Sequence, residues 1–265
     1  MVRNTMAAGV CKGSLAAFAP VPASATGERR ERGGKRTFAS LTLDAMTPAA
    51  ILFDLDDTVV DRAAGLQKYA EHLHAEFCAE LHPCNVVELH KDLLAADDFG
   101  SMCQAEALAT SPLWRTAPEA DVLYEHWGAH FGSMATLFPG CLEMLIDLRR
   151  ASVRLGLITN GESAMQRSKI VAIKVAPLME VIVISSEVGF RKPDPRIFAL
   201  ALERLGCAPS DAWFVGDHPD HDIRGAAAAG LKPFWVKTGA FNPTDVRGIH
   251  IESVASLRSY IFGLV

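Results

Sequence analysis

The chain has 265 residues, of which 49% are hydrophobic, and a formal net charge of −5 at pH 7. This length and composition suit one large domain, or a core with an inserted subdomain, and supply enough apolar residues for a packed interior. The acidic balance argues against nucleic acid as the main partner, and no apolar run approaches the ~20 residues of a membrane-spanning helix.

The six cysteines are scattered through the chain, with no CxxC pair and no matching histidine spacing. They indicate reduced thiols rather than a zinc site or a disulfide framework. We therefore expect a cytoplasmic protein with no membrane segment. Nothing in the sequence indicates an oligomeric state.

Residues 1–48 differ in composition from the rest of the chain. They are rich in Ala, Gly, Ser and Pro, and their seven basic and three acidic residues give a charge of +4, which leaves −9 for residues 49–265. We predict a disordered basic tail. A secretory signal cleaved near Ala23-Ser24-Ala25, a transit peptide and a true start at Met46 are the alternatives left open.

The first predicted strand is the apolar run at residues 50–53, which leads directly into Asp54, Asp56, Asp57 and Thr58. Such a run predicts a strand buried in a parallel sheet, with the acids at its carboxyl end, where open α/β sheets bind ligands. Two carboxylates about 4 Å apart repel by roughly 4 kcal/mol at an effective dielectric constant of ~20. A hard divalent cation such as Mg²⁺ would remove this repulsion. Taken alone, the acids could instead cap a helix.

Residues 62–136 show only helical periodicity. We predict that this segment is an inserted all-helical cap, and that residues 49–61 and 137–265 form the core domain. The expected helices cover residues 63–81, 86–96, 102–109 and 118–131. Four residues of the segment are candidates for the substrate-facing side, with ordinary packing as the alternative: Trp114, Arg115, Trp127 and Phe131.

The histidines of this segment include His126 and His130, one helical turn apart, with His72 and His74 near each other in sequence. A zinc site would want further acids or thiols at matched spacing, so we assign these histidines surface or packing roles.

From residue 138 onward, predicted helices and strands alternate. We expect helices at 141–150, 163–173, 196–205 and 221–229, and strands at 153–158, 181–184, 213–215 and 233–236. This alternation predicts a Rossmann-like three-layer α/β core with parallel strands and right-handed crossovers.

Four loops at predicted strand ends carry the polar sequences DLDDT, TNG, RKPDP and GDHPDHD. Singly, Thr159 could cap a helix and Lys192 could be a solvated loop lysine. Together, in this order and spacing, the loops indicate one site. Its candidate residues are Asp54, Asp56, Thr159, Asn160, Lys192, Asp217 and Asp222.

These motifs resemble those of the haloacid dehalogenase-like hydrolase superfamily. Asp54 and Asp56 match its first motif, Thr159 its second and Lys192 its third, and the fourth is matched by Asp217 with Asp222. The resemblance covers about residues 50–240, and the helical segment between the first two motifs is similar to the first type of cap. It implies a phosphatase of small phosphorylated metabolites that uses Mg²⁺, held by Asp54, Asp217 and the backbone carbonyl of Asp56.

The residue types suit the chemistry of a phosphate monoester, which needs a nucleophile, charge neutralisation and a proton for the leaving oxygen. We expect Asp54 to attack phosphorus and form an aspartyl-phosphate, and Asp56 to serve as general acid and then base. Thr159 and Lys192 would donate to phosphoryl oxygens, with Asn160 beside them. Asp222 would orient Lys192 or a metal-bound water.

Asp56 favours phosphoryl transfer over dehalogenation, because a departing halide needs no proton. A phosphomutase, a dehalogenase and a catalytically silent binding protein on the same fold are the alternatives. We interpret Asp57 as a structural or peripheral acid, and His218 as a weaker candidate for substrate contact.

Overall fold

A computed structural model describes residues 47–83, 86–97, 108–237, 241 and 248–263. Almost all of the predicted N-terminal tail and most of the predicted helix at 102–109 lie outside these residues. No helix within the described ranges is long and apolar enough to cross a membrane.

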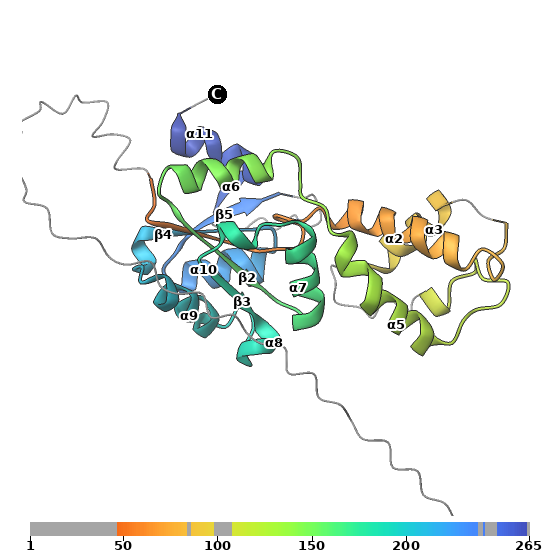
Figure 1. The fold of residues 1–265 in the computed structure, drawn as a ribbon. Helices are drawn as coiled ribbons and strands as arrows, with labels where there is room; N and C mark the ends of the chain where they lie inside the picture. The colour runs from red at the N-terminus through yellow and green to blue at the C-terminus, as the bar shows by residue number, and fades with distance from the viewer. Residues whose placement is uncertain (1–46, 84–85, 98–107, 238–240, 242–247, 264–265) are drawn as a thin grey trace, which may run out of the picture. The chain divides into compact units, whose positions relative to one another are not determined.

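Six parallel strands form a single sheet in the order β3-β2-β1-β4-β5-β6 (Figure 1). Their bounds are β1 Ala50–Phe53, β2 Arg154–Thr159, β3 Val181–Ile184, β4 Ala212–Gly216, β5 Lys232–Val236 and β6 Ile249–Ile251. The strand order reverses direction around β1, so the crevice where ligands bind in such sheets opens beside β1 and β4. The predicted α/β class with a parallel sheet is confirmed.

Helices cover both faces of the sheet, because alternate residues of each strand point to opposite sides. Ile51 and Phe53 face the layer that contains α6 (Cys141–Arg150) and α11 (Leu257–Phe262). Ala50 and Leu52 face the layer that contains α9 (Pro195–Leu205) and α10 (Gly225–Ala228). β1 is therefore fully buried and holds the acids that follow it in a fixed place.

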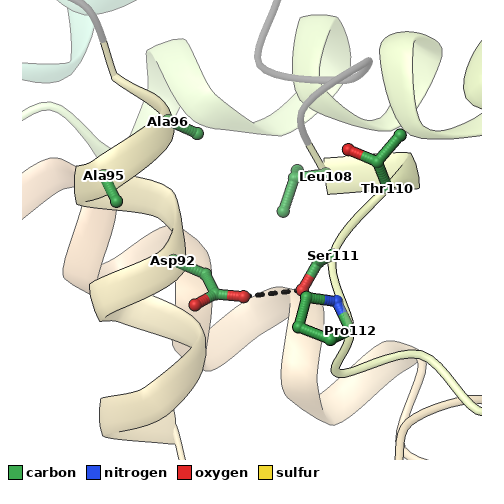
Figure 2. A pocket seen from close by; sticks show the side chains of 7 residues that line it. All are labelled: Asp92, Ala95, Ala96, Leu108, Thr110, Ser111 and Pro112. Atoms are coloured by element: carbon green, nitrogen blue, oxygen red, sulfur yellow. Dashed lines mark hydrogen bonds between the residues drawn. The ribbon is translucent and has the colours of Figure 1, made fainter.

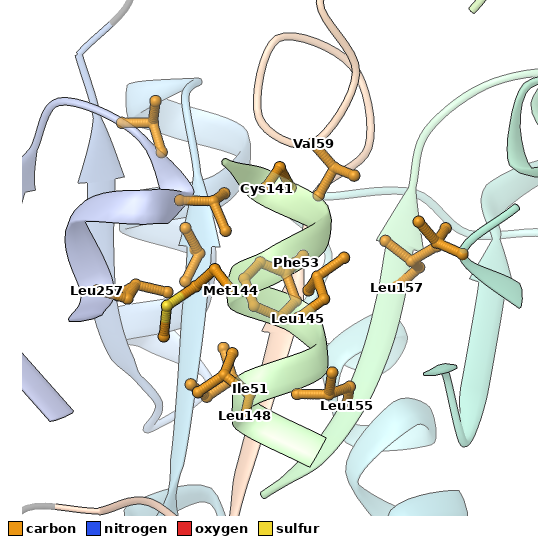
Figure 3. Packing of buried hydrophobic residues seen from close by; sticks show 14 of the residues in the cluster. Ile51, Phe53, Val59, Cys141, Met144, Leu145, Leu148, Leu155, Leu157 and Leu257 are labelled. Carbon is orange, nitrogen blue, oxygen red and sulfur yellow. The ribbon is translucent and has the colours of Figure 1, made fainter. Parts of the chain in front are cut away.

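The packing of α6 shows how one layer is held. Met144, Leu145 and Leu148 lie over Ile51 and Phe53 of β1 and are fully buried (Figure 3). Side chains of this kind each contribute about 1.5–3 kcal/mol when they leave water.

The predicted elements and the observed ones agree closely in this core. Helix α6 and strand β3 have the predicted bounds, and α7 (Ser163–Ala172) ends one residue early. The predicted helix at 221–229 is instead a π-helical turn, η4 (Pro219–Arg224), followed by α10. The short helix α8 (Ser185–Val188), β6 and α11 were not predicted, since each is too short to show a period. The core also contains the 3₁₀ turns η2 (Ala176–Leu178), η3 (Pro209–Asp211) and η5 (Val254–Ser256).

A helical insertion, here residues 62–134 as far as they are described, lies between β1 and β2. It contains α2 (Arg62–Glu76), α3 (Val86–Ala96), α5 (Ala120–His130) and the 3₁₀ turn η1 (Phe131–Met134). Asp61 caps α2 by accepting a hydrogen bond from the Ala64 backbone N–H at 2.9 Å. The prediction that this helix reaches residue 81 was wrong: it ends at Glu76, and Leu81 pairs with Trp114 instead. The second predicted helix, α3, has the predicted bounds.

The helical insertion packs directly on the core through η1 and α7. A Cβ atom added to Gly132 would lie 2.7 Å from the Cβ of Ser168 on α7, so only glycine allows this approach. The insertion also has its own apolar interior, which includes Leu66, Tyr69 and Leu123.

Candidate active site

The polar motifs meet at the carboxyl edge of the sheet because each directly follows a parallel strand. Asp54 comes after β1, Thr159 ends β2 and Asp217 comes after β4. Lys192 reaches the same point from the loop between α8 and α9. Each of these residues is buried, with at most 8% of its surface exposed.

Lys192 is the hub of this group. Its Nζ atom donates to Oδ1 of Asp54 at 2.5 Å and to Oδ1 of Asp222 at 2.6 Å. Carboxylate oxygens of Asp54, Asp217 and Asp222 lie within 4.8 Å of one another. Thr58 also donates to Asp217, at 3.4 Å. The structure thus brings together four of the residues that the sequence motifs indicate.

The three acids outnumber the one lysine among them, and the pKa values of Asp54 and Asp217 are raised. Burial raises the pKa of Asp54 to about 7, with Lys192 opposing the shift and Asp222 adding to it. Burial, Asp222 and Asp54 raise the pKa of Asp217 well above its usual value. Burial lowers the pKa of Lys192, but the two carboxylates that it contacts raise this pKa by more than burial lowers it. The lysine therefore stays charged.

This donor set fits a divalent cation. The carboxylates of Asp54 and Asp217 are hard oxygen ligands of the kind that Mg²⁺ prefers. Burial and the neighbouring acids raise their pKa values, and a bound cation would offset both effects. Asp222 belongs to the same cluster, although its two oxygens are already engaged by Lys192 and by the His218 backbone N–H at 3.0 Å. It therefore holds the lysine and the loop in place.

Asp56 lies beside this cluster and has different partners. Its carboxylate accepts from Lys169 Nζ at 2.7 and 2.9 Å and from Gln166 Nε2 at 2.8 Å, and Arg62 lies 3.8 Å away. Burial raises the pKa of Asp56, but Lys169 and Arg62 outweigh it and bring the pKa to about 2. The side chain is thus held as a carboxylate, by partners other than Lys192.

Asn160 holds the backbone of Lys192 through two hydrogen bonds. Its Oδ1 accepts from the Lys192 N–H at 2.9 Å, and its Nδ2 donates to the Lys192 carbonyl at 3.1 Å. Thr159 Oγ1 accepts from Gln166 at 2.6 Å. The TNG loop and the RKPDP loop are therefore locked together.

A cavity of about 1070 Å³ opens over these groups. Its lining includes the acids and Lys192, together with Arg191 and His218 from the core and Trp127 and Phe131 from the helical insertion. The rings of Trp127 and Phe131 stack with centroids 3.8 Å apart.

The other two residues that were candidates for the substrate-facing side of the insertion lie elsewhere. Trp114 packs inside the insertion, where its indole N–H donates to the Leu108 carbonyl at 2.7 Å, and Arg115 does not line the cavity.

A second, smaller cavity of about 300 Å³ lies within the helical insertion, between α3 and residues 108–112 (Figure 2). Its polar feature is Asp92, which accepts a hydrogen bond from Ser111 Oγ at 2.6 Å. Among the described residues that line it, only Asp92 is charged, so the larger cavity is the candidate site.

The sequence motifs did not indicate Lys169, Gln166 or Arg62 as site residues. Lys169 and Gln166 lie one turn apart on α7 and face Asp56. The signal available in the sequence was their spacing, since residues three apart on the helix that follows the TNG loop share one face.

Residues 51–236 match the haloacid dehalogenase-like hydrolase family. The phosphoserine phosphatase of Thermus thermophilus is 44% identical over 122 residues, which span 46% of this chain but only 49% of that relative. The glyceraldehyde 3-phosphate phosphatase of Pyrococcus abyssi is 32% identical over 71% of this chain and 81% of its own length.

Solved structures agree on the fold. The HAD-hydrolase YfnB from Bacillus subtilis, crystallised with magnesium bound, has a TM-score of 0.64 at 23% identity, over 81% of this chain and 98% of that one. The HAD phosphatase from Thermococcus onnurineus has a TM-score of 0.54 at 23% identity over the same shares. With the motifs in place at one sheet edge, the chain belongs to the haloacid dehalogenase-like hydrolase family.

Proposed function

We propose that the protein is a Mg²⁺-dependent phosphatase that hydrolyses a small phosphate monoester through an aspartyl-phosphate on Asp54. The observation that carries this proposal is the contact of Lys192 with Asp54 at 2.5 Å, inside a buried cluster with Asp217 and Asp222. The proposed nucleophile, a positively charged lysine and the carboxylates that could hold a metal therefore lie together in one site. The phosphatase names of the relatives support the same reaction class.

Asp54, Asp217 and the backbone carbonyl of Asp56 would hold the Mg²⁺, which would supply charge neutralisation for the phosphoryl oxygens. Lys192 provides a second positive charge there, in a place fixed by Asp222 and Asn160. Because the lysine donor is positioned before substrate arrives, little reorganisation is needed during the reaction.

The reaction would proceed in two displacements. An Asp54 carboxylate oxygen forms a bond to phosphorus while the bond from phosphorus to the leaving oxygen breaks, and Asp56 gives that oxygen a proton. Water then attacks the phosphorus of the aspartyl-phosphate, Asp56 takes its proton, and the Asp54 carboxylate is restored with release of phosphate.

Asp56 needs a change of surroundings to act as the acid. With Lys169 beside it, the carboxyl has a pKa of about 2 and carries no proton at neutral pH. A bound phosphate dianion would share the charge of Lys169 and raise the pKa of Asp56, so substrate binding itself would ready the proton donor.

We propose further that the helical insertion acts as the cap that the sequence predicts for residues 62–136, over a core of residues 49–61 and 137–265. Trp127 of α5 and Phe131 of η1 line the cavity, where they would contact the part of the substrate beyond the phosphate. A cap that closes on substrate excludes water and selects by shape. A small phosphorylated metabolite fits this cavity, and no nucleic acid or membrane partner is proposed. The described cysteines, Cys78, Cys141 and Cys207, are free thiols, which supports a cytoplasmic setting.

The test is release of phosphate from p-nitrophenyl phosphate by the purified chain. We expect turnover with Mg²⁺ and none with EDTA or in Asp54→Asn. A screen over sugar phosphates, nucleotides and phosphorylated acids then ranks substrates. Interconversion of sugar phosphates without net phosphate release would identify a mutase, release of halide from a haloacid would identify a dehalogenase, and no turnover with normal metal binding would leave a binding role.

A further inference from the structure

Three histidines and one glutamate come together in the helical insertion, away from the carboxylate cluster. His72 and Glu76 lie one turn apart on α2, and His126 and His130 lie one turn apart on α5. One ligand atom from each lies within 4.8 Å of every other. Two helices thus each present a pair of ligands, at the i and i+4 spacing that puts side chains on one face.

The spacing of the ligand atoms suits a tetrahedral metal ion. Zinc takes imidazole nitrogen and carboxylate oxygen at about 2.0–2.2 Å, so neighbouring ligands of a tetrahedron are about 3.3 Å apart. Oε2 of Glu76 lies 3.5 Å from Nε2 of His72 and 3.2 Å from Nε2 of His126. The three imidazole rings lie close to one another, with centroids 4.5–5.3 Å apart.

The surroundings of the histidines also suit a metal. Nε2 of His72 is buried and makes no hydrogen bond. His126 is almost fully buried, and its other ring nitrogen, Nδ1, lies 2.8 Å from the hydroxyl of the buried Tyr69. Metal-bound histidines are commonly oriented by such a second contact.

We propose that His72, Glu76, His126 and His130 bind a zinc-class transition-metal ion that joins α2 to α5. Mg²⁺ is a poor occupant because it prefers oxygen ligands, whereas imidazole suits zinc, copper and nickel. Four protein ligands fill a tetrahedral site, so the ion is structural rather than catalytic.

The position of the ion would connect it to the cavity. Trp127 follows His126 on α5, and its ring contacts Tyr69 edge-on at a centroid distance of 4.8 Å. Fixing α5 against α2 therefore fixes the aromatic wall of the cavity. The exposed side of Glu76, whose side chain is 48% accessible, leaves a route for the ion to enter.

The test uses the full chain, stripped of metal with EDTA and then kept in excess Mg²⁺ so that the carboxylate cluster is occupied. Zinc affinity is measured by competition with a chromophoric chelator, and the geometry from the visible spectrum of the Co²⁺ form. We expect one Zn²⁺ per chain and the intense bands of four-coordinate Co²⁺. Zinc at 100 times its dissociation constant should raise Tm by roughly 5–10 °C.

Substitutions distinguish zinc binding at the proposed histidine–glutamate site from metal binding at the carboxylate cluster. His72→Gln on α2 and His130→Gln on α5 should each weaken zinc binding more than about tenfold, by analogy with the loss of supporting groups around bound metals. His82→Gln, an exposed histidine of the same insertion, and Asp54→Asn should bind zinc as the wild type does.

Circular dichroism checks that each variant is folded, and the two histidine variants lie on different helices, so one misfolded variant does not end the test. The proposal is overturned if the wild type binds no zinc in excess Mg²⁺, if Co²⁺ is six-coordinate, or if binding is lost in Asp54→Asn but kept in His72→Gln and His130→Gln.

Discussion

Removing the charge of Lys192 tests the electrostatic design of the site. Lys192→Met keeps the length of the side chain but takes away the ammonium that lies 2.5 Å from Asp54 and 2.6 Å from Asp222. Breaking a buried ion pair by removing one partner costs about 3–5 kcal/mol, because the other charge stays buried and unpaired. For a chain of this size that is a fall in Tm of roughly 6–20 °C.

The loss should depend on pH in a defined direction. Asp54 has a folded-state pKa of about 7 against an ordinary value of 3.8. A carboxyl whose pKa is raised by folding binds protons more tightly in the folded state, so its ionisation destabilises the fold as pH rises above about 4. Without Lys192 the pKa of Asp54 rises further. Because Asp54 is protonated in both folded proteins well below pH 7, the stability deficit of Lys192→Met should be smaller near pH 5 and should grow as the pH rises above about 7.

Urea unfolding in EDTA at several pH values gives the free energy of unfolding for each protein. Lys91→Met, which removes an exposed lysine of α3, is the matched control and should change stability by less than about 0.5 kcal/mol. Mg²⁺ should restore part of the stability of Lys192→Met. A deficit equal to that of Lys91→Met, or one that grows as the pH is lowered, would refute the reasoning.

Three further predictions concern neighbouring residues. Asn160→Ala removes two hydrogen bonds to the Lys192 backbone, so the free energy of unfolding should fall by about 1–3 kcal/mol in urea denaturation, with kcat/KM reduced as well. Gly216→Ala would place a Cβ 2.5 Å from the acid that bonds the Lys192 ammonium, and should cost about 1–3 kcal/mol, whereas Gly128→Ala, with nothing within 4 Å, should not destabilise. Lys169→Met should raise the pKa of the proposed general acid and move the limb of the pH–kcat profile that reports it to higher pH; an unmoved limb would contradict that assignment.

Much of the core follows from local sequence. Strands such as residues 181–184 are continuous apolar runs between polar loops, and α6 carries apolar residues on one face only, so period and length fix both. The parallel sheet then brings the ends of β1, β2 and β4 to one edge without any knowledge of contacts. The position of Asp54 beside Asp217 is a consequence of topology.

The parts that could not be predicted depend on contacts between distant residues. Lys169, which lies 113 positions from Asp56 in sequence, donates to its carboxylate, and no sequence pattern indicates this contact. The interpretation of the histidines considered only neighbours in sequence, whereas the structure pairs His72 and Glu76 on one helix with His126 on another. Periodicity gives the face of a helix, but not which other helix meets that face.

The most direct measurement of the central claim is the identity of the residue that carries phosphorus during turnover. The protein is mixed with an excess of substrate and Mg²⁺ and quenched in acid. Reduction with borohydride then converts an aspartyl-phosphate to homoserine, which mass spectrometry locates in the chain. We predict homoserine at position 54 and none in Asp54→Asn. Phosphate release without modification of Asp54, or modification at another acid such as Asp56, would contradict the account.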